Sequence, residues 1–255
     1  MSAPVFLAEP GALGGMRVGS VYVLDGDEGR HAAVVQRRRP GERVDVVDGA
    51  GVRLRARVTA VDPAGVHLAV LEAVDEPPAW PTLTLAQALA KGDRDELAIE
   101  AATELGVDAV LPWQAERSVV VWRGDRAAKS RMRWIGTVRA ATKQARRSRV
   151  PVVEPAVDSA GLVARVGAVV RAGGLAVVLH EEAGQPLATL PLPGDGHQVE
   201  VLLAVGPEGG ITPDELAALT AAGAQAARLG PWVLRTSTAG PVALAVLATR
   251  LGRWG

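Results

Sequence analysis

From residue 83 onward, the chain alternates short apolar runs with segments of helical pattern, and this alternation restricts the possible folds more than any other feature. The predicted strands cover residues 83–89, 109–113, 176–179, 200–205 and 226–229, and the predicted helices cover 93–105, 125–147, 213–222 and 238–251. Alternating strands and helices build a mostly parallel sheet with helices on both faces. We therefore predict an α/β fold for this part of the chain.

The helix predicted for residues 93–105 carries end signals of its own. Asp93 stands in the N-cap position, Glu96 follows three residues later as a capping-box partner, and Gly106 comes just after the last residue. These signals predict a well-defined start and end for this helix.

The first part of the chain has a different pattern. Up to about Val74, Val- and Leu-rich runs alternate with turn signals at residues 48–51 and 62–65, which is typical of a small β-barrel. The three prolines of residues 76–81 form a stiff connector. We expect two domains, residues 1–74 and residues 75–255.

Several classes of protein are excluded by composition. The chain has no cysteine, so disulfides, a catalytic thiol and thiolate metal sites are excluded, and its histidines lack metal-ligand spacing. The longest apolar stretch, residues 161–179, is interrupted by Arg165 and Arg171 and is too short and too charged to span a bilayer. The first twenty residues lack a signal-peptide pattern. We expect a cytoplasmic protein with no metal and no membrane association.

A glycine-rich loop, residues 206–210, joins an apolar strand to a helix that starts with Thr212, Pro213 and Glu215. Ligands of open α/β sheets bind at the carboxyl ends of strands, where this loop lies. The loop matches neither the dinucleotide-binding nor the P-loop pattern. Glu208 makes it a poor phosphate cradle and favours a cationic or hydroxyl-rich ligand, such as a sulfonium nucleoside. The alternative is an ordinary tight turn between strand and helix.

A second segment, residues 229–241, has a Gly-Pro loop, then Arg235, then three hydroxyl residues that open an apolar helix. In a functional interpretation, Arg235 and the hydroxyls face the same ligand or its acceptor. In the alternative, the hydroxyls only cap the helix. His180 follows another predicted strand and could line the same cleft, although a histidine there is more often structural.

Charge is unevenly distributed although the formal net charge is zero. Between residues 123 and 149 there are ten Lys and Arg residues and one acid, Asp125. Arg37–Arg39 form a further run, and Arg53, Arg55 and Arg57 alternate on one face of a predicted strand. A solvated helix face is the usual meaning of such a run, but ten cations to one acid favour contact with nucleic acid or another polyanion.

These segments together resemble the small-subunit ribosomal RNA uridine N3-methyltransferases, which belong to the SPOUT superfamily of knotted methyltransferases. The motifs that carry the resemblance are GPEGG-I-T-P-D-E at 206–215, LGPWVLRTST at 229–238, KGDRDE at 91–96, TELGV at 103–107, ERS at 116–118 and AATKQARRSRVP at 140–151. His31, Arg37, residues 40–41 and residues 48–49 resemble the family's N-terminal PUA-like barrel.

The resemblance implies a C-terminal trefoil knot that holds S-adenosylmethionine, a homodimer, and methylation of N3 of a specific uridine of 16S ribosomal RNA in the small ribosomal subunit. Because uridine N3 must lose a proton, we hypothesise that Arg235 is the catalytic residue and stabilises the imide anion, with Glu208 and His180 as candidates for a base. The implied cofactor-binding residues are Leu179, His180, Gly206, Pro207, Glu208, Gly209, Gly210, Leu229, Gly230, Leu234, Arg235, Thr236, Ser237 and Thr238. The candidate RNA-binding residues are Arg37, Arg38, Arg117, Lys143, Arg147 and Arg149.

Three positions depart from the family pattern. Ser237 and Lys143 stand where the family usually has Glu, and the arginine usually found just before the first Phe is missing. One alternative is a knotted methyltransferase that acts on transfer RNA or on a ribose 2′-hydroxyl. Another is an RNA-binding ribosome assembly factor with a degenerate cofactor site, which Ser237 keeps open. A Rossmann-type oxidoreductase lacks its glycine fingerprint here.

Overall fold

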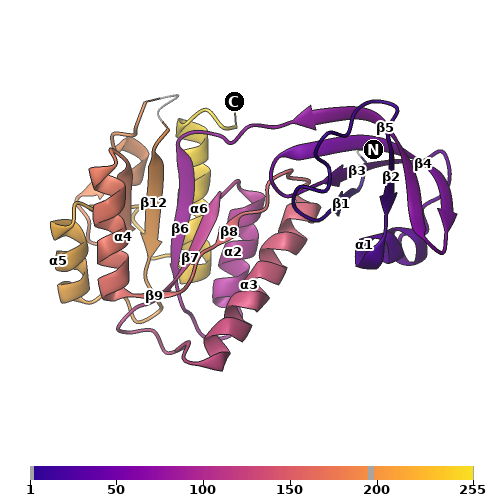
Figure 1. Cartoon of the computed structure of the whole chain (residues 1–255). Coiled ribbons are helices and arrows are strands. Elements are labelled where there is room, and N and C mark those ends of the chain that lie inside the picture. Colours follow the sequence, from indigo (N-terminus) through magenta and orange to yellow (C-terminus); the bar gives the residue numbers. More distant parts are fainter. Residues whose placement is uncertain (1–2, 195–197, 255) are drawn as a thin grey trace. The chain divides into compact units, whose positions relative to one another are not determined.

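The structure is a computed structural model that describes residues 3–194 and 198–254. The chain divides into two compact units (Figure 1). The first unit combines Met1–Pro78 with Thr142–Val150, and the second combines Ala79–Ala141 with Pro151–Gly255. No sequence signal indicated that residues 142–150 would pack with the N-terminal part of the chain.

The first unit contains a five-stranded sheet in the order β1-β3-β4-β5-β2. Its strands are β1 (Val5–Leu7), β2 (Val21–Leu24), β3 (Arg43–Val47), β4 (Val52–Asp62) and β5 (Gly65–Asp75). The pairs are antiparallel except for β1 with β3. Among the described residues, no pairing joins the edge strands β1 and β2. The α-helix α1 (Gly26–Arg30) continues directly into a π-helix at His31–Val35, and sequence analysis predicted neither of these helices.

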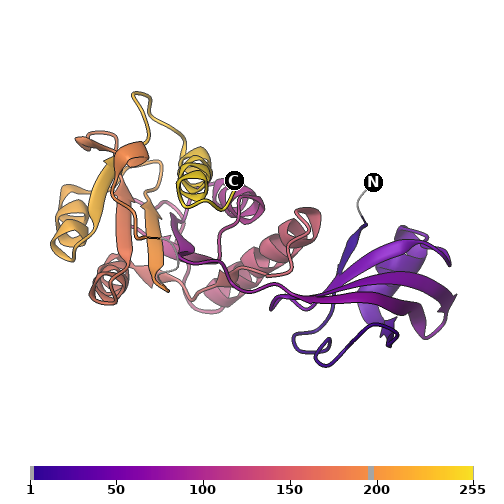
Figure 2. The same ribbon diagram turned by 90° about the horizontal axis from the view of Figure 1, so that it is seen from above.

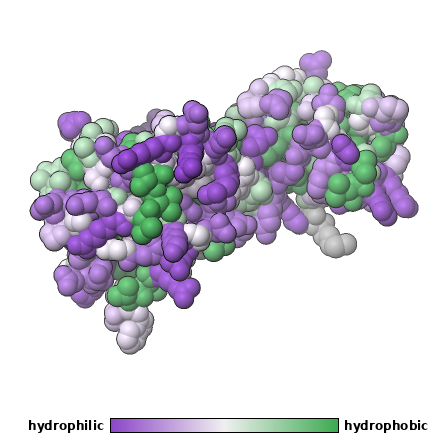
Figure 3. All heavy atoms as spheres, turned by 90° about the horizontal axis from the view of Figure 1, so that it is seen from below, coloured by the Kyte–Doolittle hydropathy of each residue, from purple (hydrophilic) through white to green (hydrophobic). Residues whose placement is uncertain are grey.

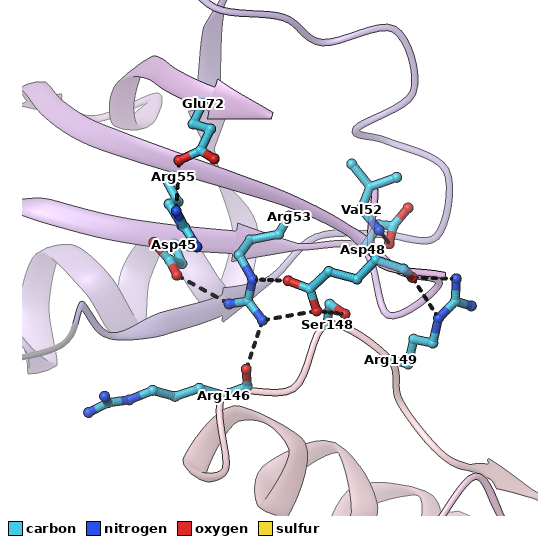
Figure 4. A network of polar contacts seen from close by, with 10 residues as sticks. Asp45, Asp48, Val52, Arg53, Arg55, Glu72, Arg146, Ser148 and Arg149 are labelled. Atoms are coloured by element: carbon cyan, nitrogen blue, oxygen red, sulfur yellow. Dashed lines mark hydrogen bonds and ion pairs between the residues drawn. The ribbon is translucent and has the colours of Figure 1, made fainter. Parts of the chain in front are cut away.

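A buried arginine on β4 and its partner Glu76 form hydrogen bonds with residues 146 and 148 (Figure 4). Arg53 is 8% exposed, and its guanidinium donates to Glu76 Oε1 at 2.5 Å, Asp45 Oδ2 at 3.1 Å and the carbonyl of Arg146 at 2.9 Å. Ser148 Oγ donates to the other oxygen of Glu76 at 2.5 Å. Because each charge in this network meets an opposite charge or a polar partner, a buried arginine is tolerated here.

The second unit contains an eight-stranded sheet in the order β11-β13-β10-β12-β6-β7-β8, with β9 also paired to β7. Every pair in it is parallel, which confirms the predicted parallel α/β architecture. The strands are β6 (Thr82–Ala88), β7 (Ala109–Gln114), β8 (Val152–Val153), β9 (Val157–Asp158), β10 (Leu175–Leu179), β11 (Gln185–Pro186), β12 (Glu200–Val205) and β13 (Gln225–Arg228).

Helices cover both faces of this sheet. α4 (Ser159–Arg171) and α5 (Pro213–Ala221) lie on one face, and α2 (Arg94–Glu104) and α6 (Thr236–Arg250) lie together on the other (Figures 1 and 2). α3 (Asp125–Gln144) is the longest helix of the described chain. Side chains alternate along β6, so Ala86 and Ala88 pack with α4, while Leu85 faces α6.

Sequence analysis missed α4, which lies within an apolar stretch. The carboxylate of Asp158 caps the helix by accepting from Gly161 N at 2.8 Å. The helix then ends before Gly173, whose φ is +80°, and β10 follows at once. Because α4 and β10 are separated by only three residues and both are rich in Val, Ala and Leu, their sequences merge into one run without a change of pattern.

Three helix ends differ from the prediction, and one of them is the start of α6, which lies at Thr236 rather than at residue 238. Asp93 adopts a left-handed φ of 48° and makes no side-chain cap bond, so the predicted capping box with Glu96 is wrong. The helix ends as predicted, with Gly106 at φ +97° directly after its C-cap residue. α3 stops at Gln144 rather than Arg147, because Arg146 turns to a φ of +56° and its carbonyl binds Arg53.

None of the helices in the described ranges is long and apolar enough to cross a membrane. Within residues 3–194 and 198–254, no group of three or more His, Asp or Glu side chains is arranged to hold a metal ion.

Gly174 marks a close approach between the end of α4 and β12. A Cβ atom there would lie 2.5 Å from the carbonyl oxygen of Glu200 and 2.8 Å from a methyl group of Val169. We expect Gly174→Ala to lower the free energy of unfolding by about 1–3 kcal/mol, measured by urea denaturation. Gly136→Ala is the control, because nothing lies within 4 Å of that position in α3, and it should add about 0.5–1 kcal/mol. Equal effects of the two changes would contradict the packing argument.

The Arg53 network should make the first unit sensitive to acid. Burial alone raises the pKa of Glu76, but hydrogen bonds from Arg53 and Ser148 lower that pKa overall. A carboxyl whose pKa is lowered by folding stabilises the protein above its unfolded pKa of about 4.3, and this contribution is lost as the pH falls through the folded pKa.

We expect Glu76→Gln to cost about 1 kcal/mol at pH 7, discounted because the side chain is 38% exposed, and to cost less below about pH 4. Urea denaturation across this pH range checks the effect. Glu72→Gln is the control, since its ion pair with Arg55 is half exposed on both sides and should contribute under about 0.5 kcal/mol. A Glu76→Gln penalty as large at pH 3 as at pH 7 would refute the assignment.

Candidate functional site

A cavity of about 680 Å³ lies at the carboxyl ends of β10, β12 and β13. It is lined by residues 179–182 after β10, residues 205–211 after β12 and residues 227–230 and 232–236 around the end of β13, together with Arg94 and Arg117. The three strands are parallel neighbours, so their carboxyl ends open at the same edge of the sheet. The volume lies within the range of about 300–1,000 Å³ found for small-molecule pockets.

Most residues that the sequence predicted for a cofactor site line this cavity. They are Leu179, His180, Gly206, Pro207, Glu208, Gly209, Gly210, Leu229, Gly230, Leu234, Arg235 and Thr236. Ser237 and Thr238 are not among the lining residues and lie in the first turn of α6. Arg94, which sequence analysis did not select, belongs to the lining.

The loop after β12 is shaped by close backbone contacts. A Cβ atom on Gly206 would lie 2.6 Å from Ile211 Cγ1, and one on Gly209 would lie 3.0 Å from Arg117 Cβ. Gly210 has a φ of +75°, which favours glycine. α5 then starts with the predicted capping box of Thr212 and Glu215, which is confirmed. The loop therefore needs glycine for packing as well as for conformation.

Glu208 connects this loop by hydrogen bonds to the start of α2 and to the turn before it. Its Oε1 accepts from the Arg94 guanidinium at 2.8 Å and from Lys91 N at 3.3 Å. Burial alone raises the pKa of Glu208, but hydrogen bonds from backbone groups and from Arg94 lower that pKa below its ordinary value. The carboxylate is therefore ionised and already engaged, which makes it a weak candidate for a general base.

Glu215 holds the same loop from its other end. Its carboxylate accepts from Ser159 Oγ, from Glu116 N at 2.8 Å and from Thr212 N at 3.0 Å. Burial alone raises the pKa of Glu215, and these hydrogen bonds lower it overall. Arg117, one residue further along, donates to the carbonyl of Gly209 at 3.1 Å. The segment after β7 and the start of α5 thus fix the loop between them.

The opposite wall carries Arg235, which is exposed and precedes the first residue of α6. In the part of the chain that the structure describes, no hydrogen bond or ion pair engages its guanidinium. Thr236 is buried, and its hydroxyl donates to the carbonyl of Gly206 at 2.8 Å instead of capping the helix. The interpretation of the hydroxyls as caps is therefore wrong for Thr236. Trp232 and Val233, on the same loop, are each 80% exposed.

His180 already uses one ring nitrogen in a hydrogen bond. Its Nδ1 accepts from the backbone N–H of Glu182 at 3.3 Å. In a neutral imidazole with this bond, the hydrogen is on Nε2, so neither ring nitrogen keeps a free lone pair. The backbone N–H of His180 donates to the carbonyl of Ala227 at 3.0 Å, which joins β10 to β13.

Several predicted RNA-binding residues of the first unit make contacts within that unit. Lys143 Nζ lies 2.6 Å from Glu28 Oε1, and Arg38 lies 3.6 Å from Glu42. Arg149 donates twice to the carbonyl of Glu76, at 2.7 and 3.0 Å (Figure 4). Arg147 also has an interaction partner. Arg37 is exposed and adopts a φ of +52°, an uncommon conformation for arginine that is found mainly in turns and strained sites.

The basic run of residues 123–149 is also partly engaged. Arg131 donates to the carbonyl of Val153, and Arg133 forms an ion pair with Glu96. Arg123, Arg126 and Lys129 lie at or near the start of α3 and are exposed. Hydrophilic side chains predominate on the face shown in Figure 3, and the apolar ones form separate patches. The run thus offers less free positive charge than its sequence suggests.

Comparison with known proteins gives the family. Residues 77–248 match a family profile described as RNA methyltransferase domain. A curated protein from Mycobacterium bovis, named ribosomal RNA small subunit methyltransferase E, is 49% identical over 236 residues, which cover 92% of this chain and 89% of that protein. A protein of the same name from Bacillus subtilis is 30% identical and covers 89% of each chain.

A solved structure has the same fold over nearly the whole chain. It is a ribosomal RNA small subunit methyltransferase E from Neisseria gonorrhoeae bound to S-adenosyl methionine, with a TM-score of 0.83, 29% identity and coverage of 98% of both chains. The cavity at the strand ends, the two loops that border it and these relatives agree. The chain belongs to the RNA methyltransferase domain family, and the curated relatives from Mycobacterium bovis and Bacillus subtilis are named ribosomal RNA small subunit methyltransferase E.

Proposed function

We propose that this protein transfers the methyl group of S-adenosylmethionine to N3 of a specific uridine in 16S ribosomal RNA. The observation that carries the proposal is the convergence of the 206–210 and 229–235 loops, with an unengaged Arg235, on one cavity. The names of the relatives, ribosomal RNA small subunit methyltransferases, support the ribosomal substrate. The cytoplasm, where small subunits are assembled, is the proposed location.

The residues of the cavity fit a sulfonium nucleoside. Leu179, Val205 and Leu234 offer apolar surface for a base, and the backbone of Gly206–Gly210 can approach a ligand closely because it carries no side chains at three positions. Glu181 and Glu182 add carboxylates suited to hydroxyl and ammonium groups. When bound, S-adenosylmethionine supplies an activated methyl group.

Arg235 is proposed to stabilise the uridine as it loses its N3 proton. The imide anion carries negative charge on O2 and O4, and a guanidinium placed beside these oxygens can stabilise that charge. Methyl transfer to N3 would exchange a carbon–sulfur bond for a carbon–nitrogen bond, so residues that position the uridine against the donor would supply much of the acceleration. Because Glu208 and His180 are both engaged, we propose that the N3 proton leaves to water rather than to a side chain.

RNA contact is proposed for both units. In the second unit, Arg123, Arg126 and Lys129 at the start of α3 and Arg117 at the cavity are suited to phosphates. In the first unit, which we propose to be a PUA-like barrel acting as the RNA-binding domain, Arg37 and Arg38 are proposed contacts. Lys143, Arg147 and Arg149 are also proposed to contact RNA. Lys143 and Arg149 would do so while keeping their contacts with Glu28 and with the carbonyl of Glu76.

A trefoil knot and a homodimer complete the proposal. Strand order supports the knot, because β10 lies between β12 and β13 in the sheet. The helix that follows β13, α6, nevertheless packs on β12, on β6 and on the 3-10 turn at residues 187–189. Such a path requires the chain to pass back across the sheet edge after residue 228. The dimer follows from the family resemblance alone.

Methyl transfer should be demonstrated on small ribosomal subunits from cells that lack the endogenous enzyme. After incubation with methyl-labelled S-adenosylmethionine, we expect N3-methyluridine at one 16S position, identified by mass spectrometry. Label on a ribose 2′-oxygen, or on transfer RNA supplied in a parallel reaction, would overturn the assigned substrate. Absence of both label and cofactor binding by calorimetry would indicate an RNA-binding assembly factor instead.

Arg235→Ala should lower the single-turnover methylation rate by about 10²-fold, because it removes the proposed charge stabilisation. Affinity for the cofactor, measured by calorimetry, should change much less. Arg235→Lys should restore part of the rate, and Arg171→Ala, at the far end of α4, is the control for a lost surface charge. A normal rate with weakened RNA binding would assign Arg235 to substrate affinity and refute its catalytic role.

A further inference from the structure

A buried glutamine lies behind the cavity, at a position that sequence analysis treated only as part of a strand. Gln87, near the end of β6, is fully buried in a strand that is otherwise mostly apolar. By strand alternation it shares a face with Leu85, and both face Gly240 of α6. Gln87 itself does not line the cavity. A buried amide is costly unless it is hydrogen-bonded, so its contacts indicate why it is there.

The hydrogen bond from Gln87 to Thr236 determines which group the Thr236 hydroxyl donates to. Its Nε2 donates to Thr236 Oγ1 at 2.8 Å and to the carbonyl of Ala88 at 3.2 Å. Because Thr236 Oγ1 receives a hydrogen from the amide, its own hydrogen is free for the carbonyl of Gly206, 2.8 Å away. The reversed amide would turn its oxygen toward the Ala88 carbonyl and would compete with Gly206 for the Thr236 hydrogen.

This orientation leaves the other end of the amide without a partner. Gln87 Oε1 is buried and has no hydrogen bond among the described residues. The position on Gly240 where a Cβ would stand lies 3.4 Å from this oxygen. Buried polar atoms are rarely left unpaired, so a role for the donor end is needed to explain why an amide occupies this position. An apolar side chain of similar shape would leave no such orphan atom.

The two bonds connect the two walls of the cavity. Gly206 is the first residue of the loop after β12, and Thr236 follows the loop after β13, and both line the cavity. We propose that Gln87 is a positioning residue that acts through Thr236 to hold these two loops in register, so that their backbone groups are preset for the cofactor. This inference rests on the proposed function, because it concerns the cofactor site of that activity.

The test is a double-mutant cycle of Gln87→Met, which keeps the length of the side chain, and Thr236→Val, which keeps its shape. The affinity for S-adenosylmethionine is measured by calorimetry, and hydrogen exchange of residues 206–210 is measured in the protein without cofactor. Thr236→Ser keeps the hydroxyl and serves as the rescue variant. Thr84→Val, a buried isosteric change on the opposite face of the same strand, is the control for general disturbance of β6.

We expect each of Gln87→Met and Thr236→Val to weaken cofactor binding about tenfold, or 1.4 kcal/mol, and the double variant to weaken it by the same factor. Hydrogen exchange of the loop should rise in all three. Thr236→Ser should recover most of the affinity and protection that Thr236→Val loses, and Thr84→Val should resemble the wild type. A hundredfold loss in the double variant, or unchanged binding in Gln87→Met, would overturn the inference. If the wild-type protein binds no S-adenosylmethionine, the proposed function fails, while the hydrogen-exchange comparison still decides whether Gln87 orders the loop.

Discussion

Parallel pairing of β10, β12 and β13 is the constraint on which the site depends. Parallel strands direct all their carboxyl ends to one edge of the sheet, so three segments distant in sequence meet there. β10 lies between the other two strands, and the loops that follow β12 and β13 therefore border the same space from two sides. No single segment could form this cavity by itself.

The loops at this edge contain little regular structure, and side chains from other elements hold them. The loop after β12 is fixed through Glu208, through the Glu215 network and through Thr236. The acids in these contacts are kept ionised by several donors each. Preorganised polar groups of this kind avoid reorganisation when a ligand arrives. Arg235 differs from them, because its charge is not already committed to the fold.

The sequence predicted those features that depend on local pattern. The parallel α/β architecture, the capping box of Thr212 and Glu215 and the two loops of the cavity all follow from periodicity, cap chemistry and glycine placement. Gln87 could not be found this way, because its partners are up to 149 positions away and a single polar residue in a strand has no local signature. The internal contacts of Lys143 and Arg149 were also hidden, since a run of charge does not reveal which acids or carbonyls lie nearby in the fold.

The assignment of residues 142–150 to the first unit also bears on how the chain is made. Arg53 and Glu76 belong to the first third of the chain, but the Arg146 carbonyl and Ser148 hydroxyl that complete their network come about seventy to ninety positions later. During synthesis from the N-terminus, the amino-terminal unit therefore remains incomplete until residue 150 has left the ribosome, and by then all of α3 has been synthesised. A fragment that ends at Pro78 would lack these partners. The unit is therefore compact in space although it is built from two separate stretches of the sequence.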